Sequence, residues 1–354
     1  MRVLSGSVGI IWALVASAFS PCAWGMSSAG QTAIAVLPPQ DRVGSGPAVE
    51  AMSRTLDAEL GRYGRVLAPG PTRDALRRLR LRNRDAAPQE QLQRLGKELG
   101  AGWLVSATVH DASGELYPNI TLSVRVYSGA TGEALWAGFA GGSGLDGPRI
   151  LGLGVLEDLE PLVTAVTRKL LASLPAQTPA IEATPGAPRS TGRVALVPLS
   201  ASTVATATRS AETVTEAVRA RLLRSGIPLV SAGRVQESIR RYQDGRWGGI
   251  TREARIDLHD EAGARFVLTG AVEAYDVPGG TLAPRPRVVV AMRLLDAGSG
   301  RIVWMDSQEQ DEAGPRLFGI GRARSAGEAA SRAVETLLAR LDDEGLGVGP
   351  AELP

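Results

Sequence analysis

Continuous runs of apolar residues open two similar stretches of the chain. Residues 33–37 (AIAVL) and residues 193–197 (RVALV) each end at a proline. A run of strand length without polar alternation is typical of a strand that is buried on both faces. Apolar residues four apart then predict a helix at about 47–61 and another at about 209–225.

The same order of elements continues after both helices. In the early stretch we predict a short strand at 66–67, a helix ending at Arg77-Arg78, a helix at 88–99, a strand at 103–109 and a terminal amphipathic helix at 155–173. In the late stretch the corresponding elements are a short strand at 229–230, a helix ending at Arg240-Arg241, a helix at 251–262, a strand at 266–272 and a terminal amphipathic helix at 326–341. Gly100 and Gly263 stand where a helix ends, a place at which glycine adopts the left-handed conformation.

A hairpin precedes each terminal helix. In residues 121–127 (TLSVRVY) apolar and polar side chains alternate, which indicates a strand with one buried face. Gly132 and Gly300 occupy the position in a three-residue turn that requires positive φ.

Two tryptophans follow these turns, and the register of the hairpins predicts their neighbours. Trp136 should lie opposite Val126, and Trp304 opposite Leu294. Both would then face the core, although exposed aromatic side chains for binding are the alternative interpretation.

The two stretches are a repeat. RVYSGATGEALW (125–136) returns as RLLDAGSGRIVW (293–304) after 168 residues, and GPRILGLG (147–154) returns as GPRLFGIG (314–321) after 167. We therefore predict a tandem duplication of one α/β unit, β-α-β-α-α-β-β-β-α, with mixed sheets covered by helices. We also expect the two sheets, or their terminal helices, to pack together.

Composition sets the domain limits. The predicted parts are a signal peptide at 1–25, a first domain at 26–174, a linker rich in Pro, Ala and Thr at 175–192, a second domain at 193–342, and a tail at 343–354. The linker should be the first site of limited proteolysis.

The amino-terminus has the pattern of an export signal. Arg2 precedes the apolar run 8–19, and Ala23-Trp24-Gly25 predicts cleavage after Gly25. Cys22, the single cysteine, stands where a lipoprotein cysteine would, but Pro21 fits a lipidation signal poorly. We expect a periplasmic protein, and one associated with the outer membrane if Cys22 is lipidated.

Charge and reactive residues argue against several classes of function. The net charge is only +2 and there are two lysines, so no dense basic stripe predicts nucleic-acid binding. The sequence predicts no cofactor and no metal site, because its two histidines, His110 and His259, lack a ligand pattern. It has no nucleophile elbow, and we expect no enzyme.

The repeated Gly-Pro-Arg loop is the first candidate binding site. Backbone N–H groups at Gly152, Gly154, Gly319 and Gly321, with Arg149 and Arg316, could hold a phosphate or carboxylate. The alternative is that these glycines only permit a tight turn.

Arginines form a second group of candidates, for a partner surface. Arg77, Arg78 and Arg80 belong to the basic segment 73–84, which could contact an acidic partner or anionic lipid. Arg125 and Arg293 lie on the hairpin face opposite the tryptophans, where solvent or a partner would cover them. A solvated helix surface is the alternative for the basic segment.

The motifs resemble a family of envelope domains. Gly263-Ala264 before the strand FVLTGAV and Ser299-Gly300 before Val303-Trp304, with Gly100-Ala101 and Thr131-Gly132 in the first copy, are similar to TolB amino-terminal-like and curli-assembly CsgG-like α/β domains. This resemblance implies the fold and a non-catalytic role as assembly factor, secretion accessory or protein-binding module. The long alternating hairpins of pore formers are not found in the sequence.

The sequence thus predicts an exported, non-catalytic envelope protein that acts as a protein-binding scaffold or as an assembly or secretion accessory. Its expected partners are other envelope proteins, with peripheral membrane association and oligomerisation left open. The alternative is a periplasmic small-ligand or glycan-binding module that uses the Gly-Pro-Arg loops or a cleft between the copies.

Overall fold

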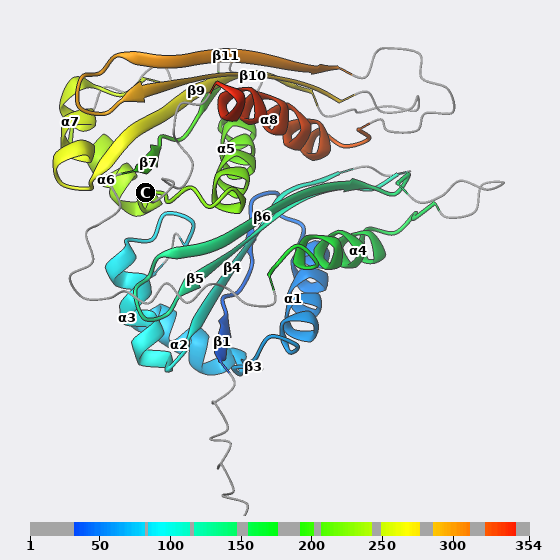
Figure 1. The fold of residues 1–354 in the computed structure, drawn as a ribbon. Helices are drawn as coiled ribbons and strands as arrows, with labels where there is room; N and C mark the ends of the chain where they lie inside the picture. Colours follow the sequence, from blue (N-terminus) through cyan, green and yellow to red (C-terminus); the bar gives the residue numbers. More distant parts are fainter. Residues whose placement is uncertain are drawn as a thin grey trace, which may run out of the picture. The chain divides into compact units, whose positions relative to one another are not determined.

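The computed structural model describes residues 32–81, 84–113, 117–146, 155–175, 192–201, 207–242, 249–276, 286–311 and 323–344. Within these residues the chain is a mixed α/β protein with two mixed sheets and eight packed helices (Figure 1). No helix in them is both long enough and apolar enough to cross a bilayer. The predicted signal segment, Cys22 and nearly all of the predicted linker lie outside the described residues.

The first sheet has the strand order β3-β1-β4-β5-β6, with β2 paired to β4. Its strands are β1 (Ala33–Val36), β2 (Gln40–Asp41), β3 (Arg65–Val66), β4 (Trp103–Ser113), β5 (Asn119–Ser128) and β6 (Ala134–Ser143). Pairing is parallel among β1, β2, β3 and β4 and antiparallel from β4 to β6. The helices of this half are α1 (Gly46–Leu60), α2 (Pro69–Arg78), α3 (Gln89–Leu99) and α4 (Leu159–Leu171).

The second sheet has the order β11-β10-β9-β7, with β8 paired to β9. Its strands are β7 (Arg193–Leu196), β8 (Ser200–Ala201), β9 (Ala264–Asp276), β10 (Arg287–Asp296) and β11 (Ile302–Asp311). The helices of this half are α5 (Ala207–Arg224), α6 (Ala232–Arg241), α7 (Arg252–Asp260) and α8 (Ala326–Asp343). The predicted strand at 229–230 is only a single bridge between Val194 and Leu229.

The hairpins have the predicted register. Val126 pairs with Trp136 and Leu294 with Trp304, and both tryptophans are buried. A bulge follows each pair because the turn glycine has the positive φ that the turn requires. Core packing, rather than exposed aromatic binding, is therefore the role of these two side chains.

The helix ends differ between the copies. In the second half Ser231, Thr251 and Ser325 each accept a hydrogen bond from a backbone N–H of the helix that they cap. The corresponding caps of the first half include Ala68 and Pro88, whose side chains have no acceptor. Packing therefore does more to hold the helices of the first half than capping does.

Each sheet packs a pair of long helices on one face. Apolar residues of α1 and α4 cover β4, β5 and β6 in the first half. Those of α5 and α8 cover β9, β10 and β11 in the second. Smaller clusters under α2 and α3, and under α6 and α7, fill part of the opposite face of each sheet.

The second half also packs its long helices on the first sheet. Helices α5 and α8 lie between the two sheets and contact β5 and β6 on the side away from α4 (Figure 1). On the second sheet, α5 and α8 cover the face that corresponds to the one α1 and α4 cover on the first sheet. On the first sheet, α5 and α8 contact the opposite face, and so the halves are stacked head to tail.

Arg80 follows α2 in a conformation that disfavours its side chain. Its φ is 53°, and the N–H of Leu81 reaches back to the carbonyl of Leu76, which is the hydrogen bond of a helix-ending motif. Arg80→Gly should raise the free energy of unfolding by about 0.5–1 kcal/mol, because glycine adopts this φ without strain. Urea unfolding measures the change, and Arg77→Gly inside α2 should instead lower stability by a similar amount.

Candidate functional site at the junction of the two halves

The predicted Gly-Pro-Arg loops lie outside the described residues, and so the structure says nothing of Arg149, Gly152, Gly154, Arg316, Gly319 and Gly321. The described residues hold no group of three His, Cys, Asp or Glu side chains suited to a metal ion. The site that the structure does describe is a cluster of buried charges where α5 meets the first sheet.

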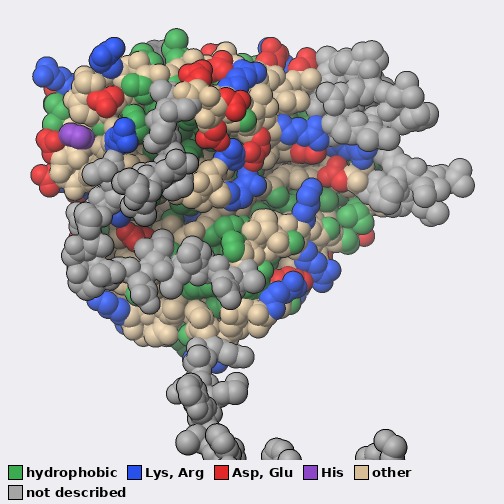
Figure 2. All heavy atoms as spheres, viewed as in Figure 1, with side chains coloured by type: hydrophobic (Ala, Val, Ile, Leu, Met, Phe, Trp, Pro, Cys, Tyr) green, Lys and Arg blue, Asp and Glu red, His purple; other side chains and the backbone are tan. Residues whose placement is uncertain are grey.

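The basic segment is exposed but partly neutralised. Arg78 at the end of α2 donates from Nε to Glu98 at 2.8 Å, and Arg77 lies 3.8 Å from Asp74. Arg80 is exposed. On the face seen in Figure 2, acidic and basic side chains are interspersed. Among the described residues of this segment, Arg77 and Arg78 thus have acidic neighbours, and Arg80 remains exposed.

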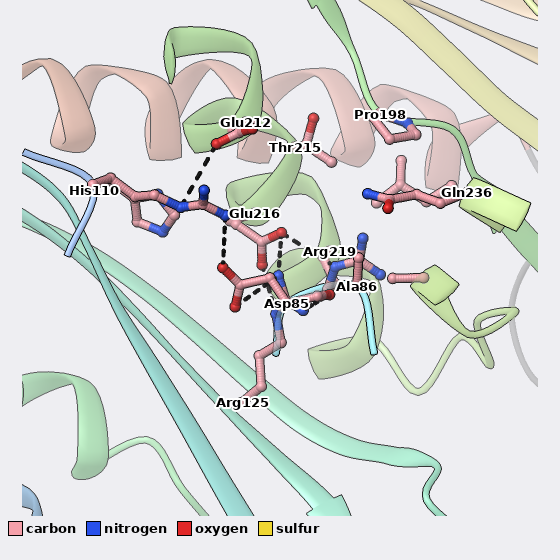
Figure 3. A pocket seen from close by; sticks show the side chains of 13 residues that line it. Asp85, Ala86, His110, Arg125, Pro198, Glu212, Thr215, Glu216, Arg219 and Gln236 are labelled. Carbon is pink, nitrogen blue, oxygen red and sulfur yellow. Dashed lines mark hydrogen bonds and ion pairs between the residues drawn. The ribbon is translucent and has the colours of Figure 1, made fainter. Parts of the chain in front are cut away.

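Arg125 lies inside the protein, and its side chain is only 4% exposed. It makes a two-point ion pair with Glu216 of α5, from Nε to Oε2 at 2.8 Å and between NH2 and Oε1 at 2.5 Å (Figure 3). Its NH1 donates to the backbone carbonyl of Asp85 at 2.6 Å and to the Tyr127 hydroxyl at 3.0 Å. The partner that covers Arg125 is thus a helix of the same chain, which corrects its assignment to an external surface.

Other charges surround this pair. Arg219 approaches Glu216 at 3.5 Å, while Arg42 contacts Asp85 at 3.2 Å and Glu212 at 3.8 Å. Burial alone would raise the pKa of Glu216, but Arg125 and Arg219 lower it to about 2. Glu216 is therefore ionised at neutral pH.

His110 adds a neutral group to the cluster. His110 belongs to β4, and its Nε2 lies 2.8 Å from the hydroxyl oxygen of Ser123 in β5. Burial lowers the pKa of His110 to about 4, and the opposing effect of Glu216 is smaller. The ring is therefore uncharged at neutral pH.

The pKa of His110 predicts a loss of stability in acid. Between the unfolded value of 6.5 and the folded value of about 4, the unfolded chain binds more protons, so stability falls as the pH is lowered. Lowering the pH from 7.5 to 5 should therefore reduce the free energy of unfolding by about 2 kcal/mol through this histidine. Urea unfolding of the protein and of His110→Gln at both pH values isolates its share, because glutamine does not titrate. An equal pH effect in the two proteins would contradict the assignment.

A small cavity lies within the cluster. Its volume is about 110 Å³, and its lining includes Arg42, Arg125 and Arg219 together with Asp85, Glu212 and Glu216 (Figure 3). Three positive charges face three negative ones, so the cavity favours neither an anion nor a cation. Ligand sites usually enclose about 300–1,000 Å³, so this space suits a few water molecules and not a sugar or cofactor. The arrangement joins the two halves and performs no evident chemistry.

Arg293 is the counterpart of Arg125, 168 residues later, but its surroundings differ. It is half-buried on the outer face of β10, opposite Met305 of β11, and no carboxylate of the described residues pairs with it. The buried cluster itself was missed by the sequence analysis. The sequence shows only that Glu216 stands where the first copy has Arg54, and the burial of Glu216 is seen only in the structure.

Part of the chain matches the model of a known protein family. Residues 163–310 match the family model described as peptidoglycan-synthase activator LpoB. The match spans less than half of the chain and covers most of the second half. The family is described as one of activators, which agrees with the prediction of a non-catalytic role. The match is to LpoB and not to the TolB-like or CsgG-like domains that the motifs resemble, although an envelope protein is consistent with both.

Solved structures show distant likeness. A PelC dodecamer from Paraburkholderia phytofirmans is 21% identical, with 42% of this chain and 86% of that chain covered and a TM-score of 0.30. Lipoprotein GNA1162 from Neisseria meningitidis is 19% identical, with 40% and 99% covered and a TM-score of 0.29. The LpoB C-terminal domain from Escherichia coli is 21% identical, with 35% and 87% covered and a TM-score of 0.22. Similarity of this extent assigns no function. No curated protein matches the chain.

Proposed function

We propose that this chain is an exported accessory of the bacterial envelope that stimulates a peptidoglycan synthase by direct protein contact. The observation that carries the proposal is the match of residues 163–310 to the LpoB activators. The chain acts in the periplasm, with an outer-membrane anchor if Cys22 is lipidated. The domain limits given above remain part of this proposal.

The character of the described site supports a binding role. The buried charges balance one another and fix the two halves, and the cavity between them is too small for a glycan. Nothing in the described residues favours the alternative of a small-ligand or glycan-binding module, and the Gly-Pro-Arg loops on which that alternative partly rested are outside them.

A synthase assay tests the proposal. The purified chain is added to a peptidoglycan synthase of the same bacterium, and glycan polymerisation from the lipid-linked disaccharide precursor is followed. We expect the rate to rise severalfold and to saturate as the chain is titrated, with binding saturating over the same range. The chain alone should polymerise nothing. An unchanged rate, together with no measurable binding, would overturn the proposal.

A further inference from the structure

The first sheet shows how helices cover the outer face of this repeated unit. On the first sheet, the outward side chains near Arg125 are buried by α5 and α8, and Glu216 supplies the charge that Arg125 requires. Gly141 of β6 and Gly327 of α8 allow the close approach, because a Cβ on Gly327 would lie 2.3 Å from Oγ1 of Thr121. The partner of this face is therefore a helical surface with small residues and a carboxylate.

On the corresponding face of the second sheet, the described residues include no second pair of long helices that packs as α5 and α8 do on the first. A step of 168 places Arg293 at Arg125, Ala291 at Ser123 and Met305 at Ala137. Ala137 is 2% exposed, whereas Met305 is 70% exposed. Within the described residues, the helix that packs extensively on β10 and β11 is α8, which lies on the opposite face.

The chemistry of this open face is that of a docking surface. Arg293 pairs with the exposed Met305 and Ala291 with the exposed Ser307, and β11 continues on this face with the exposed Glu309 and Asp311. A Cβ on Gly249 would lie 3.5 Å from NH2 of Arg293, and among the described residues no acidic side chain pairs with Arg293 as Asp85 does with Arg125. The neighbouring Glu309 is already bound to Arg287 at 2.7 Å. The described part of this face therefore offers a half-buried positive charge without a carboxylate partner, beside the exposed apolar side chain of Met305.

A second copy of the chain fits this face poorly. Head-to-tail stacking would bring α1 and α4 of the next copy into the place that α5 and α8 occupy. The aligned positions then present Arg54 in place of Glu216 and Glu160 in place of Gly327. Arg54 would meet Arg293 with like charge, and Glu160 would hold the helix away from the sheet.

We infer that the outer face of β10 and β11, centred on Arg293 and Met305, binds a helix of another protein that carries a carboxylate for Arg293 and small residues toward Met305. This deepens the proposed function and rests on it in naming the synthase as that protein. The match to the activator family includes β10 and all of β11 except Asp311.

Charge reversal tests the surface in the full chain. Arg293→Glu should weaken binding to the synthase at least tenfold, since it places a carboxylate against a carboxylate. Arg301→Glu makes the same charge change in the exposed turn of the same hairpin and should alter binding less than twofold. Circular dichroism and thermal melting establish that both variants fold. Equal affinities of the two variants for the synthase would overturn the inference while leaving the proposed function intact.

Photo-crosslinking identifies the occupant independently. A benzophenone amino acid at position 305, introduced into the full chain in the native cell, should crosslink to a helix of another protein with Asp or Glu within one turn of the linked residue. Arginine at that acidic residue should restore binding of Arg293→Glu. If the synthase does not bind at all, the proposed function fails, and a crosslink to such a helix of a different protein still supports the surface. Crosslinks only to a second copy, or to no protein, would overturn the inference.

Discussion

Arg125→Met is expected to lower the free energy of unfolding by about 3–5 kcal/mol. The substitution leaves the Glu216 carboxylate of α5 buried against the first sheet, with the weaker contact to Arg219 at 3.5 Å. It also removes the donor to the carbonyl of Asp85. An unpaired buried charge costs far more than the pair contributes, and so the loss should exceed that of any surface substitution.

The repeat supplies the matched control for this substitution. Arg293→Met replaces the corresponding residue of the second sheet, where no carboxylate of the described residues is left behind, and should change stability by less than about 1 kcal/mol. Urea unfolding measures both variants. Replacing Glu216 by leucine together with Arg125→Met should recover only part of the loss, because Arg219 then loses the carboxylate that it contacts. Equal losses in the two single variants would show that the ion pair is not what distinguishes the two sheets.

Gly141→Val should lower stability by about 3 kcal/mol. A Cβ at this position would lie 2.5 Å from the backbone nitrogen of Glu328, so β6 and α8 would have to move apart. Such a movement disturbs the whole contact between the halves, since α5 and α8 pack on the same sheet face.

Glu309→Val is the control for Gly141→Val. Glu309 is the corresponding residue of β11, it is exposed, and its pair with Arg287 is exposed as well. The substitution should cost less than about 1 kcal/mol, because an exposed ion pair contributes little. Urea unfolding again provides the measurement, and a Gly141→Val protein as stable as the wild type would rule out the close packing of α8 on β6.

Local sequence patterns predicted many elements of the fold. Gly132 and Gly300 identified the hairpin turns, which fixed the pairing of Trp136 and Trp304. Helices α1 and α5 followed from apolar spacing, since their buried stripes are set by a period of 3.6 residues. The two-residue strands β2 and β8 were not predicted, because each comes just after a proline and is too short to show a period.

The site could not be predicted in the same way. Arg125 and Arg293 occupy equivalent positions of the repeated hairpin, yet Arg125 is buried under α5 and Arg293 is partly exposed. Burial of Arg125 depends on Asp85, which the fold of the first half brings to it, and on Glu216, which reaches it only through the stacking of the halves. No periodicity within one repeat contains that information.

Thiol labelling at two corresponding positions tests most directly whether one sheet face is closed within the chain while its counterpart is open to a partner. Protein expressed from Met26 has no cysteine, since Cys22 is the only one. Single substitutions Ala137→Cys and Met305→Cys then report on positions that are 2% and 70% exposed. We predict that the thiol at position 305 reacts with a maleimide as fast as a free thiol and is shielded by the synthase, while that at 137 reacts slower by on the order of 100-fold, through opening of the structure. Similar rates at both positions, or no shielding of position 305 by bound synthase, would contradict the account.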